Sequence, residues 1–194
     1  MENKEWEGVG MENHFVNYHK HCNYSNNITS DSVAKPIDYI NKAKELGHKM
    51  VFSTQHGTVC GYWEYYTLCQ KYDLKFGFAV EAYFSLSQDK EDKTNAHIML
   101  IAKNKNGFKQ INKLISWANK ENFYYKARIT INKLIEYCSP NDVIITTACI
   151  GGLWKYENHI DIITTLYNYF KDSFYLEIQP HSNDRQIAVS YTHL

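Results

Sequence analysis

Several features that would place a chain in a special class are missing from this sequence. Its five cysteines are odd in number and contain no Cys-x-x-Cys pair, which argues against a disulfide framework. No apolar run approaches the roughly 20 residues of a membrane span. Residues 1–10 are polar and acidic, whereas a secretion signal is basic and then apolar. We therefore expect a cytoplasmic protein without a membrane partner.

An excess of charge of one sign is also missing. Lysine and arginine together number 21, as do aspartate and glutamate, so the formal net charge is zero. A free-standing DNA-binding domain is usually basic, and the balance argues against nucleic-acid binding as the only task of the chain. It does not exclude a small substrate end held by metal ions. The 44% apolar and 15% aromatic content is sufficient for a packed core in one domain of 194 residues.

Short apolar stretches alternate with amphipathic ones along the chain. The expected strands are 14–18, 50–54, 75–84, 97–102, 142–148 and 174–179, and the expected helices are 36–46, 62–72, 106–122, 131–137 and 160–170. Pro36 suits the start of the first helix and Gly47 its end. The charged run 87–95 is expected to form a loop. This alternation predicts parallel βα units in an α/β fold, either a barrel or an open sheet.

The first candidate ligands lie in a His-x-His motif. His19 and His21 point to the same side of an extended backbone, so both imidazoles can face one metal ion. Taken alone, such a motif is more often a pair of surface histidines. Asp31, further along the chain, is by itself typical of a turn beside a helix.

Two further candidates belong to predicted strands. His56 follows the strand 50–54 and precedes Gly57, which gives the backbone room to turn. Glu81 interrupts the apolar strand 75–84. Because an unpaired buried charge is costly, Glu81 needs a partner, either a metal ion or an arginine or lysine.

The last candidates are a histidine and a cysteine. His97 opens an apolar strand, and Cys149 follows another and precedes Gly151 and Gly152. A buried cysteine is usually a small hydrophobic residue, so neither residue is decisive alone. In sequence order, however, the candidates supply imidazole, carboxylate and thiolate groups. This set is sufficient for two or three divalent ions of the Zn, Mn or Fe type.

At this point eight segments resemble the PHP (polymerase and histidinol phosphatase) domain that opens DNA polymerase III alpha subunits of the bacterial or phage type. In family order they are 18–25, 43–49, 54–57, 80–83, 97–104, 123–129, 147–152 and 174–179. The resemblance implies an α/β fold, the PHP-type distorted (β/α)7 barrel, truncated at its carboxyl end. We expect an extension at 1–13, a partial PHP domain at 14–188 and a non-native tail at 189–194.

The resemblance also implies a metal cluster. Its implied ligands are His19, His21, Asp31, His56, Glu81, His97 and Cys149. His19 and His21 would hold one ion, Asp31 and His56 a neighbouring one, and Glu81 would bridge them, while the last two ligands complete a further position. Glu81 and His56 are the expected catalytic residues. Such a cluster activates a bound water for phosphoester hydrolysis.

Other residues carry weaker expectations. The planar fork of Arg128 suits a substrate phosphate, although an ordinary ion pair is an equal alternative. His181 is a weaker candidate for a functional residue. The histidines expected to be structural or exposed are His14, His48, His159 and His193.

The sequence departs from the family pattern at two points. Gln55 stands where the family usually has an acid, which is expected to change a hydrogen bond behind a ligand but not the number of ions. The family's final Asp-x-His motif has no counterpart, since Asp184 is followed by Arg185 and Gln186. The chain is therefore expected to be inactive by itself.

Three functions remain open. The first is the amino-terminal domain of a replicative polymerase, with a phosphoesterase or 3′–5′ exonuclease site, Mg for the parent polymerase, and DNA and the polymerase core of the same chain as partners. The second is a small-molecule phosphatase resembling histidinol phosphatase. The third is a non-catalytic scaffold. Segments 123–129 and 147–152 favour the polymerase branch, whereas Gln55 gives some support to the scaffold.

Overall fold

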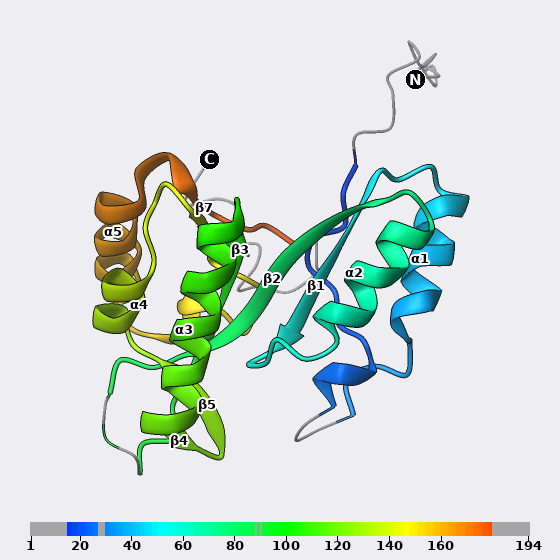
Figure 1. Ribbon diagram of the computed structural model, residues 1–194. Helices are drawn as coiled ribbons and strands as arrows, with labels where there is room; N and C mark the ends of the chain where they lie inside the picture. Colours follow the sequence, from blue (N-terminus) through cyan, green and yellow to red (C-terminus); the bar gives the residue numbers. More distant parts are fainter. Residues whose placement is uncertain (1–14, 27–29, 88, 90, 180–194) are drawn as a thin grey trace, which may run out of the picture.

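The structure is a computed structural model that describes residues 15–26, 30–87, 89 and 91–179 (Figure 1). Strands lie between two groups of helices: α1 (Pro36–Glu45) and α2 (Tyr62–Lys71) on one side, and α3 (Lys105–Glu121), α4 (Ile131–Tyr137) and α5 (His159–Phe170) on the other. None of the helices in the described ranges is long and apolar enough to cross a membrane. The expected extension 1–13, the expected tail 189–194, His14, His181 and His193 lie outside the described residues.

The described strands form one seven-stranded sheet. They are β1 (Met50–His56), β2 (Lys75–Phe84), β3 (Ala96–Ala102), β4 (Phe123–Tyr124), β5 (Lys126–Ile129), β6 (Val143–Thr146) and β7 (Phe174–Tyr175). The hydrogen-bonded order is β4-β5-β2-β3-β6-β7, and β1 also pairs with β2. β1 pairs with β2 as far as Glu81, and β5 pairs with it from Tyr83 onward. Short 3-10 helices lie at Asn23–Ser25, Leu153–Lys155 and Lys171–Ser173.

The α/β class is confirmed, but the expectation of parallel units throughout is wrong for β3. This strand runs antiparallel to both β2 and β6. The loop 85–95 between β2 and β3 contains no described helix. Without a crossover helix, the chain reverses direction and pairs antiparallel with the strand it has just left.

Most helix boundaries agree with the sequence-based expectations, whereas several strands are shorter. Pro36 is the first residue of α1, and Gly47 adopts a φ of +72° just beyond its end. The expected strand 14–18 is wrong, because Phe15–Tyr18 has no strand structure. The expected strand 174–179 is reduced to the two residues of β7.

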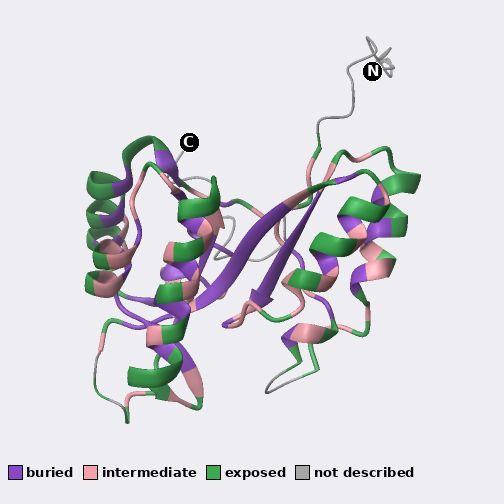
Figure 2. Cartoon of the chain, viewed as in Figure 1, coloured by how far each residue is buried: buried purple, intermediate pink, exposed green. Residues whose placement is uncertain are grey.

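Alternation along the central strands separates two faces of the sheet. Val80 and Ala82 of β2 belong to the large apolar core packed with α3, α4 and α5. Ala79 faces the other way and contacts Phe52 and Met99 in a smaller cluster. Figure 2 shows how completely the central strands are buried between the helix groups. Glu81 shares the parity of Ala79, so the fold presents its carboxylate on this inner face.

Candidate metal centre

The segment that carries the His-x-His motif lies against β1 without joining the sheet. The backbone N–H of Lys20 donates to Thr54 Oγ1 at 3.0 Å, and the Thr54 hydroxyl donates back to the Lys20 carbonyl at 2.5 Å. These two hydrogen bonds hold the segment in an extended conformation. The strand expected from the sequence lay just before this segment. His19 and His21 consequently face the same side, as the spacing predicted, with ring centroids 5.4 Å apart.

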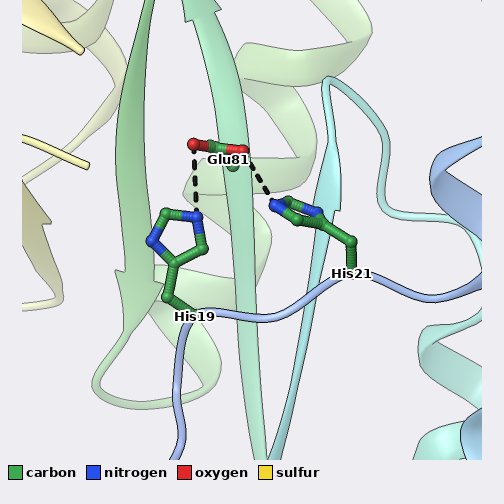
Figure 3. Close-up of side chains that lie close together, drawn as sticks. All are labelled: His19, His21 and Glu81. Atoms are coloured by element: carbon green, nitrogen blue, oxygen red, sulfur yellow. Dashed lines mark ion pairs between the residues drawn. The ribbon is translucent and has the colours of Figure 1, made fainter. Parts of the chain in front are cut away.

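Glu81 lies at the centre of the site with 0% of its surface exposed. Its Oε1 is 3.2 Å from His19 Nε2 and 3.1 Å from His97 Nδ1. Its Oε2 is 3.1 Å from His21 Nε2 and 2.7 Å from His56 Nδ1. Figure 3 shows the first and third of these contacts, one imidazole on each carboxylate oxygen. Two groups of three ligands share Glu81, and in each group the ligand atoms lie within 4.8 Å of one another.

The chemistry of this cluster fits divalent metal ions. Both Glu81 oxygens and His56 Nδ1 are fully buried, so the imidazoles around the carboxylate, and not water, meet its charge. Burial acts to raise the pKa of Glu81, but the four surrounding imidazoles outweigh it and hold this pKa well below its usual range. An ionised carboxylate ringed by imidazole nitrogens is a ligand set suited to Zn, Mn or Fe.

Asp31 and Cys149 each contact one histidine of the cluster. Asp31 Oδ2 is 3.4 Å from His56 Nε2, the ring nitrogen that does not contact Glu81. Cys149 Sγ is 3.3 Å from His97 Nδ1. Burial, together with the charge of Glu81, raises the pKa of Cys149 to about 12. The structure therefore brings all seven expected ligands together.

A tight turn delivers Cys149 to the cluster. Ala148 adopts a φ of +57°, in the left-handed region. A β-carbon at Gly152 would collide with the carbonyl oxygen of Thr147, so only glycine fits there. Gly152 also forms an isolated parallel bridge with His97. The small residues after β6 thus close the turn against β3.

Glu177 was missed as a site residue at the level of sequence. Its Oε1 lies 2.5 Å from His19 Nδ1, and its Oε2 accepts a hydrogen bond from Thr146 Oγ1 at 2.8 Å. Burial lowers the pKa of His19, but Glu177 and Glu81 outweigh it and raise this pKa to about 9. A carboxylate behind an imidazole fixes the ring and leaves the other nitrogen for a metal. The available signal was an acid after the apolar run 174–176, the same signal that identified Glu81.

A second support lies behind His21. Ser25 Oγ donates to Gln55 Oε1 at 2.7 Å and lies 3.2 Å from His21 Nδ1. Because the hydroxyl has one proton and gives it to Gln55, it accepts from His21 Nδ1. His21 Nε2 is then the nitrogen with a free lone pair, and it faces Glu81. Gln55 therefore lies behind His21, one of the expected ligands.

The contacts of Arg128 are with a loop. Its side chain is buried, and the guanidinium donates to the carbonyl oxygens of Asp89 and Asp92. Its expected contact with a phosphate stays a prediction. Two histidines expected to be structural lie outside the cluster: His48 packs on Phe15 and His159 on Trp154.

A mixed α/β sheet with a buried carboxylate among four histidines defines a candidate centre for divalent metal ions. The PHP domain family matches residues 17–181, and the chain belongs to this family. It is 33% identical over 195 residues to the DNA polymerase III subunit alpha of Borreliella burgdorferi, covering 94% of this chain and 17% of that protein. The Aquifex aeolicus DNA polymerase III subunit alpha is 34% identical over 194 residues, covering 91% of this chain and 16% of the relative.

The chain thus spans about one sixth of the length of these relatives. A solved structure from Bifidobacterium adolescentis, described as a metal-dependent phosphoesterase, is 17% identical with a TM-score of 0.36. It covers 53% of this chain and 34% of that one. At this level the likeness adds nothing to the family assignment.

Proposed function

We propose that this chain is the PHP domain of a replicative DNA polymerase III alpha subunit and that its centre hydrolyses phosphoester bonds. The observation that carries the proposal is the position of Glu81, buried and approached on each oxygen by two imidazoles. The identity to polymerase alpha subunits supports the branch of the family.

In this proposal each ligand holds a defined position. His19 and His21 would hold one ion, His56 and Asp31 would hold a neighbouring one, and Glu81 would be a ligand shared by both. Two or three ions of the Zn, Mn or Fe type would lower the pKa of a bound water and neutralise phosphate oxygens. His97 and Cys149 would supply ligands for a further ion.

The protein itself contributes fixed orientation and a dry interior. Glu177 holds His19, and Ser25 holds His21, so that neither ring has to reorient when it binds. Glu81 remains ionised at neutral pH because the surrounding imidazoles stabilise its charge. His56 is the second catalytic residue, since it lies between Glu81 and Asp31 and adjoins an open cavity.

The biological setting is part of the proposal, and the identity to polymerase alpha subunits supports it. The domain, 14–188, would pack against the polymerase core of the same chain in the cytoplasm. Its substrate would be the 3′ end of a DNA strand, giving 3′–5′ exonuclease chemistry. Polymerisation with Mg would belong to the remaining parts of such a subunit.

Metal content tests the centre directly. The purified chain, dialysed against Zn or Mn, should retain about two or three ions per molecule. His19→Ala should lose ions, and His159→Ala, a histidine outside the cluster, should not. A chain that holds no ion would refute the proposal.

Substrate choice tests the branch. In the complete reading frame, the centre should shorten a single-stranded 3′ end, and His19→Ala should abolish that activity. Hydrolysis of small phosphomonoesters without action on the 3′ end would assign the chain to the phosphatase branch instead. If the chain binds ions but hydrolyses neither substrate, the result would support the third function, a non-catalytic scaffold.

A further inference from the structure

A cavity of about 290 Å³ adjoins the metal centre on the side of His56. Its wall includes Gly57, Tyr83, Asn119, Tyr125 and Lys126. Pockets for small ligands usually begin at about 300 Å³, so this cavity matches one small ligand and not an extended chain. It is therefore the place where the group attached to a reacting phosphate can lie.

A series of side-chain contacts connects the metal centre to this cavity. Tyr83 is stacked on His56, with ring centroids 6.0 Å apart and an interplanar angle of 10°. Lys126 Nζ lies 4.2 Å from the centroid of the Tyr83 ring. Lys126 forms no ion pair with any carboxylate of the described residues. A lysine beside a phosphoesterase centre and without an acidic partner is available to a phosphate.

The electrostatic surroundings agree with this placement. Burial and the nearby charge of Lys155 lower the pKa of Lys126, whereas Asp31 and Glu81 act in the opposite direction. Lys126 is thus within the field of the metal ligands and of a second lysine. A phosphate placed there would relieve the repulsion between the two lysines.

The outer wall of the cavity is aromatic and exposed. Phe123 and Tyr125 have 54% and 65% of their surface exposed. Tyr125 adopts a φ of +56°, a left-handed conformation that bulky residues rarely occupy and that often marks a functional site. Lys93 Nζ lies 4.9 Å from the centroid of the Tyr125 ring. Exposed rings beside cations are the elements with which proteins bind single-stranded nucleic acids.

Arg128 contributes to this arrangement indirectly. Its guanidinium binds the carbonyl oxygens of Asp89 and Asp92, which fixes the loop that carries Lys93. The buried arginine therefore holds in place the loop whose Lys93 contacts the Tyr125 ring.

We propose that this cavity is a nucleotide subsite, in which Lys126 contacts the phosphate next to the metal centre and Tyr125 stacks on the base. The inference deepens the proposed phosphoesterase function and rests on it for the position of the phosphate. It assigns binding of the terminal nucleotide of a nucleic-acid strand to residues of β5 and of the turn before it.

The test compares a nucleotide with the corresponding sugar phosphate, in which a hydroxyl group replaces the base. Thymidine 5′-monophosphate and 2-deoxyribose 5-phosphate are titrated into the Mn-loaded 194-residue chain by calorimetry. We expect the nucleotide to bind about tenfold more tightly, within the range of base–aromatic stacking. Equal affinity for the two ligands would overturn the proposal.

Paired variants locate the subsite. Tyr125→Gly, which also relieves the left-handed backbone, should abolish the preference for the nucleotide, whereas Tyr125→Phe should retain it. Lys126→Ala should weaken both ligands about tenfold, and Lys126→Arg should restore them. Tyr167→Ala and Lys120→Ala, exposed residues of α5 and α3, serve as controls without effect. A preference that persists in Tyr125→Gly would refute the assignment.

Metal analysis of the same samples separates the two proposals. If ions bind but the base makes no difference, the subsite fails and the metal centre stands. If the base preference depends on Tyr125 while no ion binds, the phosphoesterase function fails and the subsite stands.

Discussion

The carboxylates of Glu177 and Asp31 occupy equivalent positions on opposite sides of the centre but differ in their surroundings. His19 lies between Glu81 and Glu177, and His56 lies between Glu81 and Asp31. The Glu177 side chain is 6% exposed and contacts His19 at 2.5 Å. The Asp31 side chain is 31% exposed and contacts His56 at 3.4 Å.

The difference separates a supported half of the centre, around His19, from an open half, around His56. Glu177 is bound on both sides, by the imidazole and by Thr146, so it can orient a ligand but has little freedom to become one. Asp31 is at the rim, and the adjoining cavity opens beside His56. We infer that the supported half fixes an ion and that the open half admits the substrate.

The largest effect should come from the residue that both halves share. Glu81→Gln removes the negative charge from a site where four imidazole nitrogens lie within 3.2 Å. Each half loses a ligand, so metal affinity should fall more than about 100-fold, beyond the usual cost of losing a group behind a ligand. Elemental analysis after dialysis measures the loss.

The matched control is Glu136→Gln, a surface carboxylate paired with Lys133. It should leave the metal content unchanged, because exposed pairs of this kind contribute little. Retention of both ions by Glu81→Gln would show that the halves do not share this ligand.

The next effect is a dependence on pH that belongs to the supported half. In the metal-free chain the pKa of His19 is raised from 6.5 to about 9, so between these values the ring holds a proton that an ion must displace. Metal affinity should rise about tenfold per pH unit up to roughly pH 9 and level off above it. The stabilisation from the His19–Glu177 pair has the opposite sign, being complete below pH 6.5 and lost as pH rises through 9.

Competition titrations against a chelator at several pH values measure the first effect, and urea unfolding of the metal-free chain measures the second. Metal affinity that is flat from pH 6.5 to 9 would show that His19 binds no extra proton.

A smaller loss should follow from Glu177→Gln. The amide preserves the shape but no longer stabilises the proton on His19 Nδ1, so metal affinity at pH 9 should fall ten- to a hundredfold. The dependence on pH should flatten at the same time, since the pKa of His19 loses its Glu177 contribution. Glu157→Gln, an exposed acid elsewhere, is the control. An unchanged pH profile in Glu177→Gln would remove the distinction between the two halves.

Sequence reasoning proposed candidate ligands in both halves, some from a local signal and the complete set from the resemblance to the family. His19 and His21 are two residues apart, and His56 and Glu81 stand at or near the ends of apolar strands, where barrel folds collect their side chains. Glu177 has a similar local pattern, but what identifies it is contact with His19, which is 158 positions away in the chain. Such contacts depend on tertiary packing, and no spacing of residues in the sequence predicts them.

The direction of β3 and the contacts of Arg128 could not be predicted from the sequence, because they also depend on tertiary packing. Whether β3 runs parallel or antiparallel depends on the connection before it, and a polar loop without a helix predicts neither its path nor its partners. The guanidinium of Arg128 could equally have met a phosphate, a carboxylate or, as the structure has it, backbone carbonyls of that loop.

The smallest effect should come from Asp31→Asn in the open half. The amide keeps the size of the side chain but is a weaker ligand, and partial exposure already screens the charge of Asp31. Metal affinity should fall about tenfold or less, at the low end of the cost of perturbing a metal site. Stability of the metal-free chain should change by less than about 0.5 kcal/mol, as for other surface substitutions. Chelator competition and urea unfolding measure the two quantities. A loss as large as that of Glu177→Gln would mean that Asp31 fixes its imidazole as firmly as Glu177 does, and the substrate would then have to enter elsewhere.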